Sequence, residues 1–200
     1  MGMKVPPRAG TGAGAGAEAG LPPSVARQPI FGPGLEVSGY ELFFRTDDAG
    51  TLMNFDECDL ARAAGNHPAF INLTEDFILK GHCDTLPPDR VVLEILEDVR
   101  PGPAVLGELR RLSNLGYRIA LDDFVFETDQ VPLVRLADIV KIDILATERT
   151  QVRRLAVGLG RYGVRLLAEK IETEEALRFA MDLGFDFLQG YFLSRPDSDW

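Results

Sequence analysis

The chain has 200 residues, 46% of them hydrophobic, which is enough for one domain with a substantial core. Its 21 Lys and Arg stand against 31 Asp and Glu, so the formal net charge is −10 at pH 7. This acidic balance argues against a nucleic-acid polymer or an anionic membrane surface as the main partner.

Cysteine spacing and the distribution of apolar residues bear on the cellular compartment. Cys58 and Cys83 lack the CxxC spacing of a metal or redox motif, so we expect both thiols to be reduced. No run approaches the ~18 apolar residues of a membrane span, and the N-terminus lacks the apolar stretch of a signal peptide. These features predict a cytoplasmic protein.

The first 23 residues differ in composition from the rest of the chain. Residues 1–23 are rich in Gly, Ala and Pro and cannot bury a core, so we expect a disordered tail. Residues 24–200 are predicted to form one folded domain.

Strand-like runs begin directly after this tail. Residues 25–31 and 37–45 flank a short Gly-Pro-Gly turn and are expected to pair antiparallel. Further runs with strand character occupy residues 69–73, 91–96, 117–122, 138–143, 164–169 and 185–190. Helical periodicity marks residues 103–116, 148–163 and 173–184. The order predicts an α/β fold, a (β/α)8 TIM-like barrel with an antiparallel first strand; a doubly wound open sheet is the alternative.

Polar side chains stand at or near the C-terminal ends of the predicted strands. They are Glu41, Asn72, Glu94, Asp122, Asp123, Lys141, Glu169 and Gln189. In a barrel, this rim brings residues of several strands into one active site. Each residue taken singly is compatible with a structural ion pair, but carboxylates gathered around one lysine repel unless a divalent cation lies among them. The oxygen ligands favour Mg²⁺ or Mn²⁺ over zinc, and an adjacent Asp pair suits two metals.

At this point the ordered motifs resemble those of the bacterial EAL domains, phosphodiesterases or receptors for cyclic di-GMP. The similarity covers residues 25–196 and rests on "RQPIF", "YELFFR", "INLT", "LEILE", "LDDF", "VKID", "AEKIET" and "QGYFLSRP". The forms "ARQPIF" and "AEKIET" are most similar to EAL domains that precede an HDOD domain.

The resemblance implies a two-metal site with Mg²⁺ or Mn²⁺ as cofactor. The ligands of the first ion would be Glu41, Asn72, Glu94 and Asp122. Asp123 and Glu169 would hold or share the second ion. Lys141, together with Glu169, would be catalytic by positioning and activating the attacking water.

The resemblance also implies contacts with the nucleotide. Gln28, Arg45 and Gln189 would contact cyclic di-GMP, with Arg45 as the charge partner of a phosphate. Glu172 would support the loop that follows the Asp pair. In the family this loop couples metal binding to dimerisation, so a homodimer or another protein partner is expected.

Three departures from the family pattern affect the expected activity. The glycine-rich loop after the Asp pair is replaced by Phe124-Val125-Phe126-Glu127-Thr128, which lacks the conformational freedom of glycine. Lys170 replaces a small glycine beside Glu169, which would put an ammonium in a metal's place. Only 26 residues, 46–71, separate Arg45 from Asn72, so an outer helix is expected to be shortened or absent, leaving a contact surface.

These departures lead to two readings of function. The first is a degenerate EAL domain that binds cyclic di-GMP, a protein partner or both, with little or no hydrolysis, because a metal site needs its supporting residues as well as its ligands. The alternative is an active Mg- or Mn-dependent cyclic di-GMP phosphodiesterase.

Overall fold

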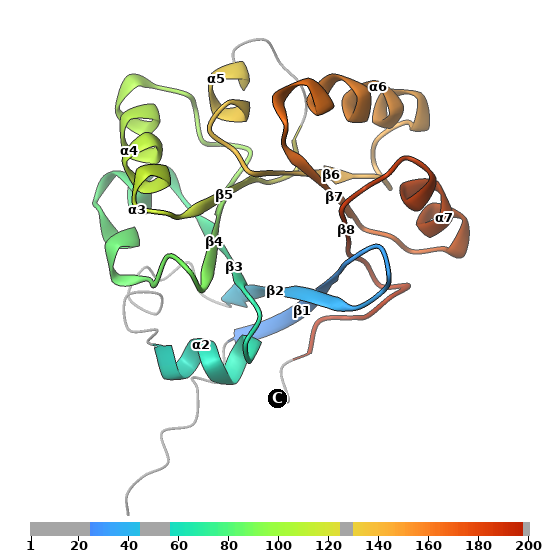
Figure 1. The fold of residues 1–200 in the computed structure, drawn as a ribbon, viewed down its shortest axis with the longest axis horizontal. Coiled ribbons are helices and arrows are strands. Elements are labelled where there is room, and N and C mark those ends of the chain that lie inside the picture. The colour runs from blue at the N-terminus through green and yellow to red at the C-terminus, as the bar shows by residue number, and fades with distance from the viewer. Residues whose placement is uncertain (1–24, 45–56, 125–129, 198–200) are drawn as a thin grey trace, which may run out of the picture.

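A closed barrel of eight strands forms the centre of the computed structural model, which describes residues 25–44, 57–124 and 130–197 (Figure 1). The strands follow one another around the barrel in chain order. The first strand is antiparallel to both of its neighbours, and all other neighbouring strands are parallel. The predicted TIM-like barrel with an antiparallel first strand is thereby confirmed, and the open-sheet alternative is excluded.

The strands lie within the ranges predicted from the sequence. They are β1 Val25–Phe31, β2 Val37–Phe44, β3 Ala69–Leu73, β4 Val91–Ile95, β5 Arg118–Leu121, β6 Ile139–Asp143, β7 Arg165–Glu169 and β8 Phe187–Leu188. Only β8 is much shorter than predicted. After Leu188, Gln189 N still donates to Ala168 O of β7 at 2.9 Å, and Gln189 O accepts from Ile171 N, in the segment that follows β7, at 3.0 Å.

Helices surround the strands on the outside of the barrel (Figure 1). The α-helices are α2 Glu57–Ala64, α3 Glu75–Leu79, α4 Pro103–Asn114, α5 Val131–Val134, α6 Arg149–Leu159 and α7 Glu174–Asp182. Short 3₁₀ turns cover His82–Thr85 and Gly160–Tyr162. The sequence predicted α4, α6 and α7 but not α2, α3 or α5. These helices have so few turns that the hydrophobic pattern repeats too few times to be recognised.

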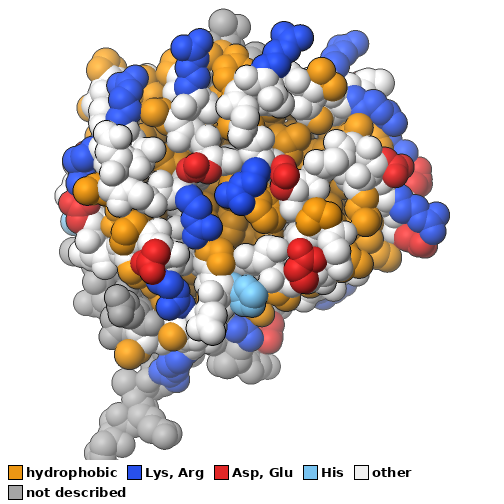
Figure 2. Space-filling model, in the orientation of Figure 1, with side chains coloured by type: hydrophobic (Ala, Val, Ile, Leu, Met, Phe, Trp, Pro, Cys, Tyr) orange, Lys and Arg blue, Asp and Glu red, His pale blue; other side chains and the backbone are white. Residues whose placement is uncertain are grey.

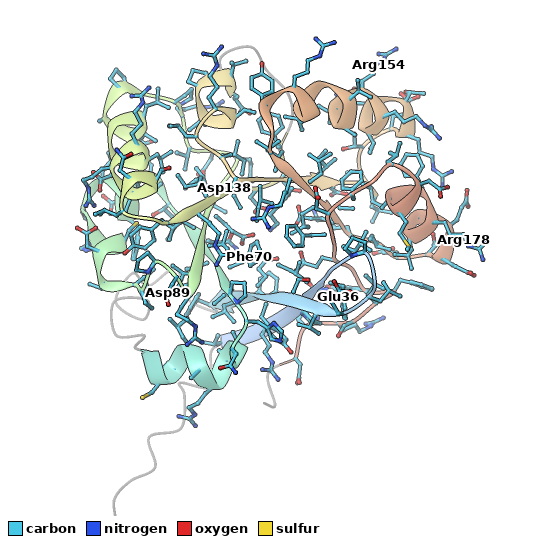
Figure 3. The ribbon with its side chains drawn as sticks, in the orientation of Figure 1. Glu36, Phe70, Asp89, Asp138, Arg154 and Arg178 are labelled. Atoms are coloured by element: carbon cyan, nitrogen blue, oxygen red, sulfur yellow. The ribbon has the colours of Figure 1, made fainter. Side chains whose placement is uncertain are left out.

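Two apolar clusters make up the core. The larger one packs the outward faces of the strands against the helices. The smaller one fills the barrel interior and consists of Ile30, Phe70, Val92, Ala120, Ile139 and Leu167, with Phe187 packed against it. Phe70 is 2% exposed and lies within the ring of strands in Figure 3. This interior layer is a packed floor beneath the polar residues described below.

The face of the molecule seen in Figure 2 carries charges of both signs. Acidic and basic side chains are interspersed with apolar ones on the side seen in Figure 2. Arg154 on α6 and Arg178 on α7 point away from the barrel in Figure 3. Among the described helices, none has the length and apolar character needed to cross a membrane.

Candidate functional site

A polar layer lies inside the barrel next to the apolar floor. Side chains of a strand alternate between its two faces, so the residue two places beyond a floor residue points into the same interior. Asn72 follows Phe70 in this way, and Glu94 follows Val92. The neighbouring strands β3 and β4 pair Phe70 with Val92 and Asn72 with Glu94. The members of the layer are Gln28, Glu41, Asn72, Glu94, Asp122, Lys141, Glu169 and Gln189.

Lys141 stands at the centre of this layer. Its Nζ lies 2.8 Å from both Glu94 Oε1 and Asp122 Oδ1. The same atom lies 3.0 Å from Glu169 Oε1 and 3.4 Å from Glu41 Oε2. The lysine side chain has no exposed surface. One ammonium therefore faces a set of carboxylates whose summed negative charge it cannot balance alone.

This imbalance shifts the ionisation of the buried groups. Burial, with the charge of Glu41 adding to it, raises the pKa of Glu94 well above its ordinary value. Burial also raises the pKa of Glu169 to about 8, against the opposing effect of Lys141. For Lys141 itself, burial lowers the pKa, but the surrounding carboxylates outweigh burial and raise it well above the usual value.

Several buried oxygen atoms of the layer lack a hydrogen-bond donor. They are Glu94 Oε2, Asn72 Oδ1 and Glu169 Oε2, whereas Glu94 Oε1 forms an ion pair with Lys141 Nζ at 2.8 Å. Leaving such atoms unpaired is costly, and a hard divalent cation satisfies several oxygens at once. The donor atoms therefore fit Mg²⁺ or Mn²⁺. As the side chains stand, no three His, Cys, Asp or Glu residues of the described ranges are arranged as a metal site; the oxygens converge on the lysine.

Neutral amides orient Glu41 from two sides, Gln189 just after β8 and Asn72 on β3. Gln189 Nε2 donates to Glu41 Oε2 at 2.8 Å and approaches Gln28 Oε1 at 3.4 Å. Asn72 Nδ2 donates to Glu41 Oε1 at 3.4 Å. Gln28 and Gln189 are both buried. The carboxylate of Glu41 is thus held in place by uncharged donors as well as by the lysine.

A second lysine, Lys170, forms a separate ionic cluster at the barrel mouth. Its Nζ lies 2.7 Å from Asp143 Oδ2 and 3.2 Å from each carboxylate oxygen of Asp123. Partial burial opposes ionisation of Asp143, but the hydrogen bonds from Lys170 and two backbone N–H groups outweigh it and lower the pKa of this carboxyl. Hydrogen bonds to Asp143 and Asp123 likewise outweigh partial burial and raise the pKa of Lys170.

Asp143 was not singled out from the sequence. It closes β6 two residues after Lys141, so the strand period already placed it on the same face. Its role became visible only in three dimensions, because its partner Lys170 belongs to the segment after β7.

A pocket of about 600 Å³ opens above the polar layer. Among the predicted site residues its lining contains Gln28, Glu41, Asn72, Asp122, Asp123, Glu169, Glu172 and Gln189. Lys141 and Glu94 lie beneath it with no exposed surface. Tyr191 and Pro196 also line the pocket and were not predicted. Arg45 and residues 125–128 lie outside the described residues.

A closed barrel with an antiparallel first strand and a carboxylate-rich mouth defines a class of TIM-like domains. Comparison with known families identifies the family within this class. The EAL domain family matches residues 50–196. The chain therefore belongs to the EAL domain family.

Two relatives are similar in sequence over most of this chain. YuxH of Bacillus subtilis (strain 168) is 34% identical over 191 residues, covering 86% of this chain and 47% of that protein. Cyclic di-GMP phosphodiesterase CdgJ of Vibrio cholerae serotype O1 is 36% identical over 193 residues, covering 86% and 44%. The chain thus spans about half the length of these relatives.

A solved structure shares the fold. It is the YkuI protein of Bacillus subtilis, with an EAL domain, in complex with substrate cyclic di-GMP and calcium. Its TM-score is 0.67 at 21% identity, over 88% of this chain and 57% of that chain.

Proposed function

We propose that this chain is a cyclic di-GMP-binding EAL domain with little or no phosphodiesterase turnover. Its pocket of about 600 Å³ has the size of a small-molecule site. Family membership and the cyclic di-GMP bound to the YkuI protein support this ligand. In the pocket, Gln28 and Gln189 would contact the nucleotide, and Arg45 would pair with a phosphate.

The first metal position is well supplied with oxygen ligands. Glu41, Asn72, Glu94 and Asp122 would hold one Mg²⁺ or Mn²⁺, since the unpaired oxygens of Asn72 and Glu94 suit such an ion. When bound, the ion would polarise the phosphodiester and activate water for attack. Lys141 would hold the surrounding carboxylates in place and, with Glu169, orient the water.

The proposal of limited turnover rests on one observation, the contact between Lys170 and Asp123. Asp123 would be needed for a second ion, but the Lys170 ammonium lies 3.2 Å from both of its carboxylate oxygens. An ammonium neutralises the aspartate without offering the coordination sites that a metal gives to substrate oxygens. Hydrolysis that depends on a pair of metals would therefore proceed slowly even with the other ligands in place.

The active phosphodiesterase remains the second candidate. It is favoured by the similarity to the Vibrio cholerae phosphodiesterase and by the retention of every predicted ligand. The two candidates differ in whether Lys170 leaves the second position open when Mn²⁺ and nucleotide are both present.

The test measures bound and cleaved nucleotide in the same protein preparations. Calorimetry with Ca²⁺ would follow cyclic di-GMP binding, and chromatography with Mn²⁺ would follow its cleavage. Wild type should bind the nucleotide and cleave it barely above background. Lys170→Gly should raise turnover on the order of 100-fold to 1,000-fold, the effect typical of one electrostatic stabiliser of the transition state.

Lys170→Arg is the matched control, because it keeps the charge and should remain as slow as wild type. Robust Mn²⁺-dependent cleavage by the unmodified chain would establish the active phosphodiesterase instead. An absence of binding heat in wild type would leave only a protein partner as the target of this domain.

A further inference from the structure

The junction between β1 and β8 is the most sparsely paired one in the barrel. One residue pair, Phe31 with Leu188, joins these strands, whereas every other junction has at least two. Pro29 lies two residues before Phe31 and has no backbone N–H to donate. The N-terminal part of β1 therefore needs another partner at this edge.

Residues 194–197, here named the clasp, supply that partner. Arg27 N donates to Asp197 O, and Asp197 N donates to Arg27 O, both at 2.8 Å. The two residues form an antiparallel bridge outside the named strands. In Figure 1 the C-terminal segment runs back beside β1 after leaving β8. The clasp thus closes the barrel where the β1–β8 ladder stops.

The clasp also holds a side chain of the pocket. Gln28, next to Arg27, is 6% exposed, and its Nε2 donates to Ser194 O at 2.9 Å. Its Oε1 faces Gln189 Nε2 at 3.4 Å, and that amide donates to Glu41 at 2.8 Å. Pro196, in the middle of the clasp, lines the pocket. A backbone bridge and a side-chain hydrogen bond therefore tie the same short segment to neighbouring residues of β1.

We propose that the clasp is a positioning element that fixes Gln28 in the pocket. Without the Ser194 carbonyl, the buried Gln28 amide would lose its acceptor and regain rotamer freedom, both of which disfavour a single orientation. The affinity of the pocket then depends on a segment that belongs to none of the eight strands. The proposal rests on the proposed function only for the identity of the ligand.

The main experiment is independent of any ligand. Two-dimensional ¹⁵N NMR of the full chain would follow the Gln28 side-chain amide and the hydrogen exchange of the Arg27 backbone amide. Asp197→Pro removes the N–H that bonds to Arg27, and Asp197→Ala is the control that keeps it. A chain ending after Arg195 is a second way to remove the bridge.

Both bridge-breaking variants should speed exchange at Arg27 and broaden or shift the Gln28 side-chain signals, while Asp197→Ala should match wild type. Unchanged signals from α4 and α7 would show that the fold persists. With Ca²⁺ present, Asp197→Pro should weaken cyclic di-GMP binding about fivefold, as expected for one uncharged hydrogen bond. Gln28→Ala should weaken it equally, and the double variant should be no weaker than either.

A Gln28 amide that stays ordered while Arg27 exchanges fast would overturn the proposal, as would an Arg27 amide still protected in Asp197→Pro. Wild type that shows no nucleotide binding would contradict the proposed function alone. The NMR comparison would still decide whether the clasp positions Gln28.

Discussion

Lys170 and Asp123 both adopt a backbone conformation that favours glycine. Their φ angles are 56° and 39°. Such conformations cost about 1–3 kcal/mol each, whereas a half-exposed ion pair contributes about 0–1 kcal/mol. The free energy of the ion pair therefore does not by itself offset the cost of the two strained backbone conformations. The hydrogen bonds of Ile171 with Gln189 and Phe192, at 3.0 Å and 2.9 Å, hold the adjoining backbone in place.

The contribution of Lys170 to stability should depend on pH. Lys170→Gln should lower the Tm at pH 7 by about 1–4 °C, because the lost pair is worth up to about 1 kcal/mol and each kcal/mol shifts Tm by about 2–4 °C. The pKa of Asp143 in the fold lies below its ordinary value of 3.8, so the folded state holds fewer protons than the unfolded state just below that pH. The contribution is present above pH 3.8 and is lost as the pH falls through the folded pKa.

Thermal melts of wild type and variant between pH 7 and the lowest pH with a cooperative transition would measure this loss. Lys80→Gln, which removes the exposed pair with Asp76, is the control for a generic loss of surface charge. A Tm difference that stayed constant as the pH approached that limit would contradict the assignment to Asp143.

At the scale of elements, the turn after β8 depends on one glycine. Gly190 has φ 155°, and a Cβ built there would lie 2.2 Å from Ile171 N and 2.3 Å from Ile171 O. Both atoms belong to the backbone, which cannot move aside as a side chain can. The turn is therefore packed directly on the segment that follows β7, and it sets the direction of the chain toward the clasp.

Gly190→Ala should consequently destabilise the domain by about 1–3 kcal/mol, the usual effect of overpacking. Gly107→Ala is the matched comparison, because Gly107 lies inside α4 with nothing within 4 Å of an added Cβ. That change should stabilise the domain by about 0.5–1 kcal/mol. Urea unfolding of both variants measures the difference, and equal stabilities would refute the close approach at Gly190.

For the whole molecule, the barrel combines an apolar floor with a polar layer that carries excess negative charge. The floor supplies burial, while the carboxylates around Lys141 make the mouth electrostatically unfavourable without a further cation. A cation that binds only the folded state would offset this cost and stabilise the entire domain by linkage.

Millimolar Mn²⁺ should accordingly raise the Tm of wild type by about 5–10 °C, since about 2.7 kcal/mol is expected at 100 times Kd and each kcal/mol shifts Tm by about 2–4 °C. Glu94→Gln should remove most of this rise, and chelation with EDTA should reverse it. Glu36→Gln, in the turn between β1 and β2, should keep the full rise (Figure 3). A wild-type melt unaffected by Mn²⁺ would rule out a metal at the polar layer.

The sequence by itself determined the class of fold and most members of the polar layer. Glu94 and Lys141 were expected at one rim of the barrel because they lie at or near the C-terminal ends of predicted strands, and the ranges of those strands proved nearly right. The motif order was likewise sufficient to identify the family. Short helices such as α5 and the two-residue β8 were beyond this reasoning, because their boundaries depend on packing rather than on periodicity.

Only the tertiary structure decided which charged groups meet. Lys170 and Asp143 are 27 positions apart, and they pair because β6 and β7 run side by side in the barrel. Asp197 and Arg27 are still further apart, and their bridge exists because the closed sheet brings the two ends of the folded chain to one junction. Such contacts follow from barrel closure, a property of all the strands together, and no local pattern of residues encodes them.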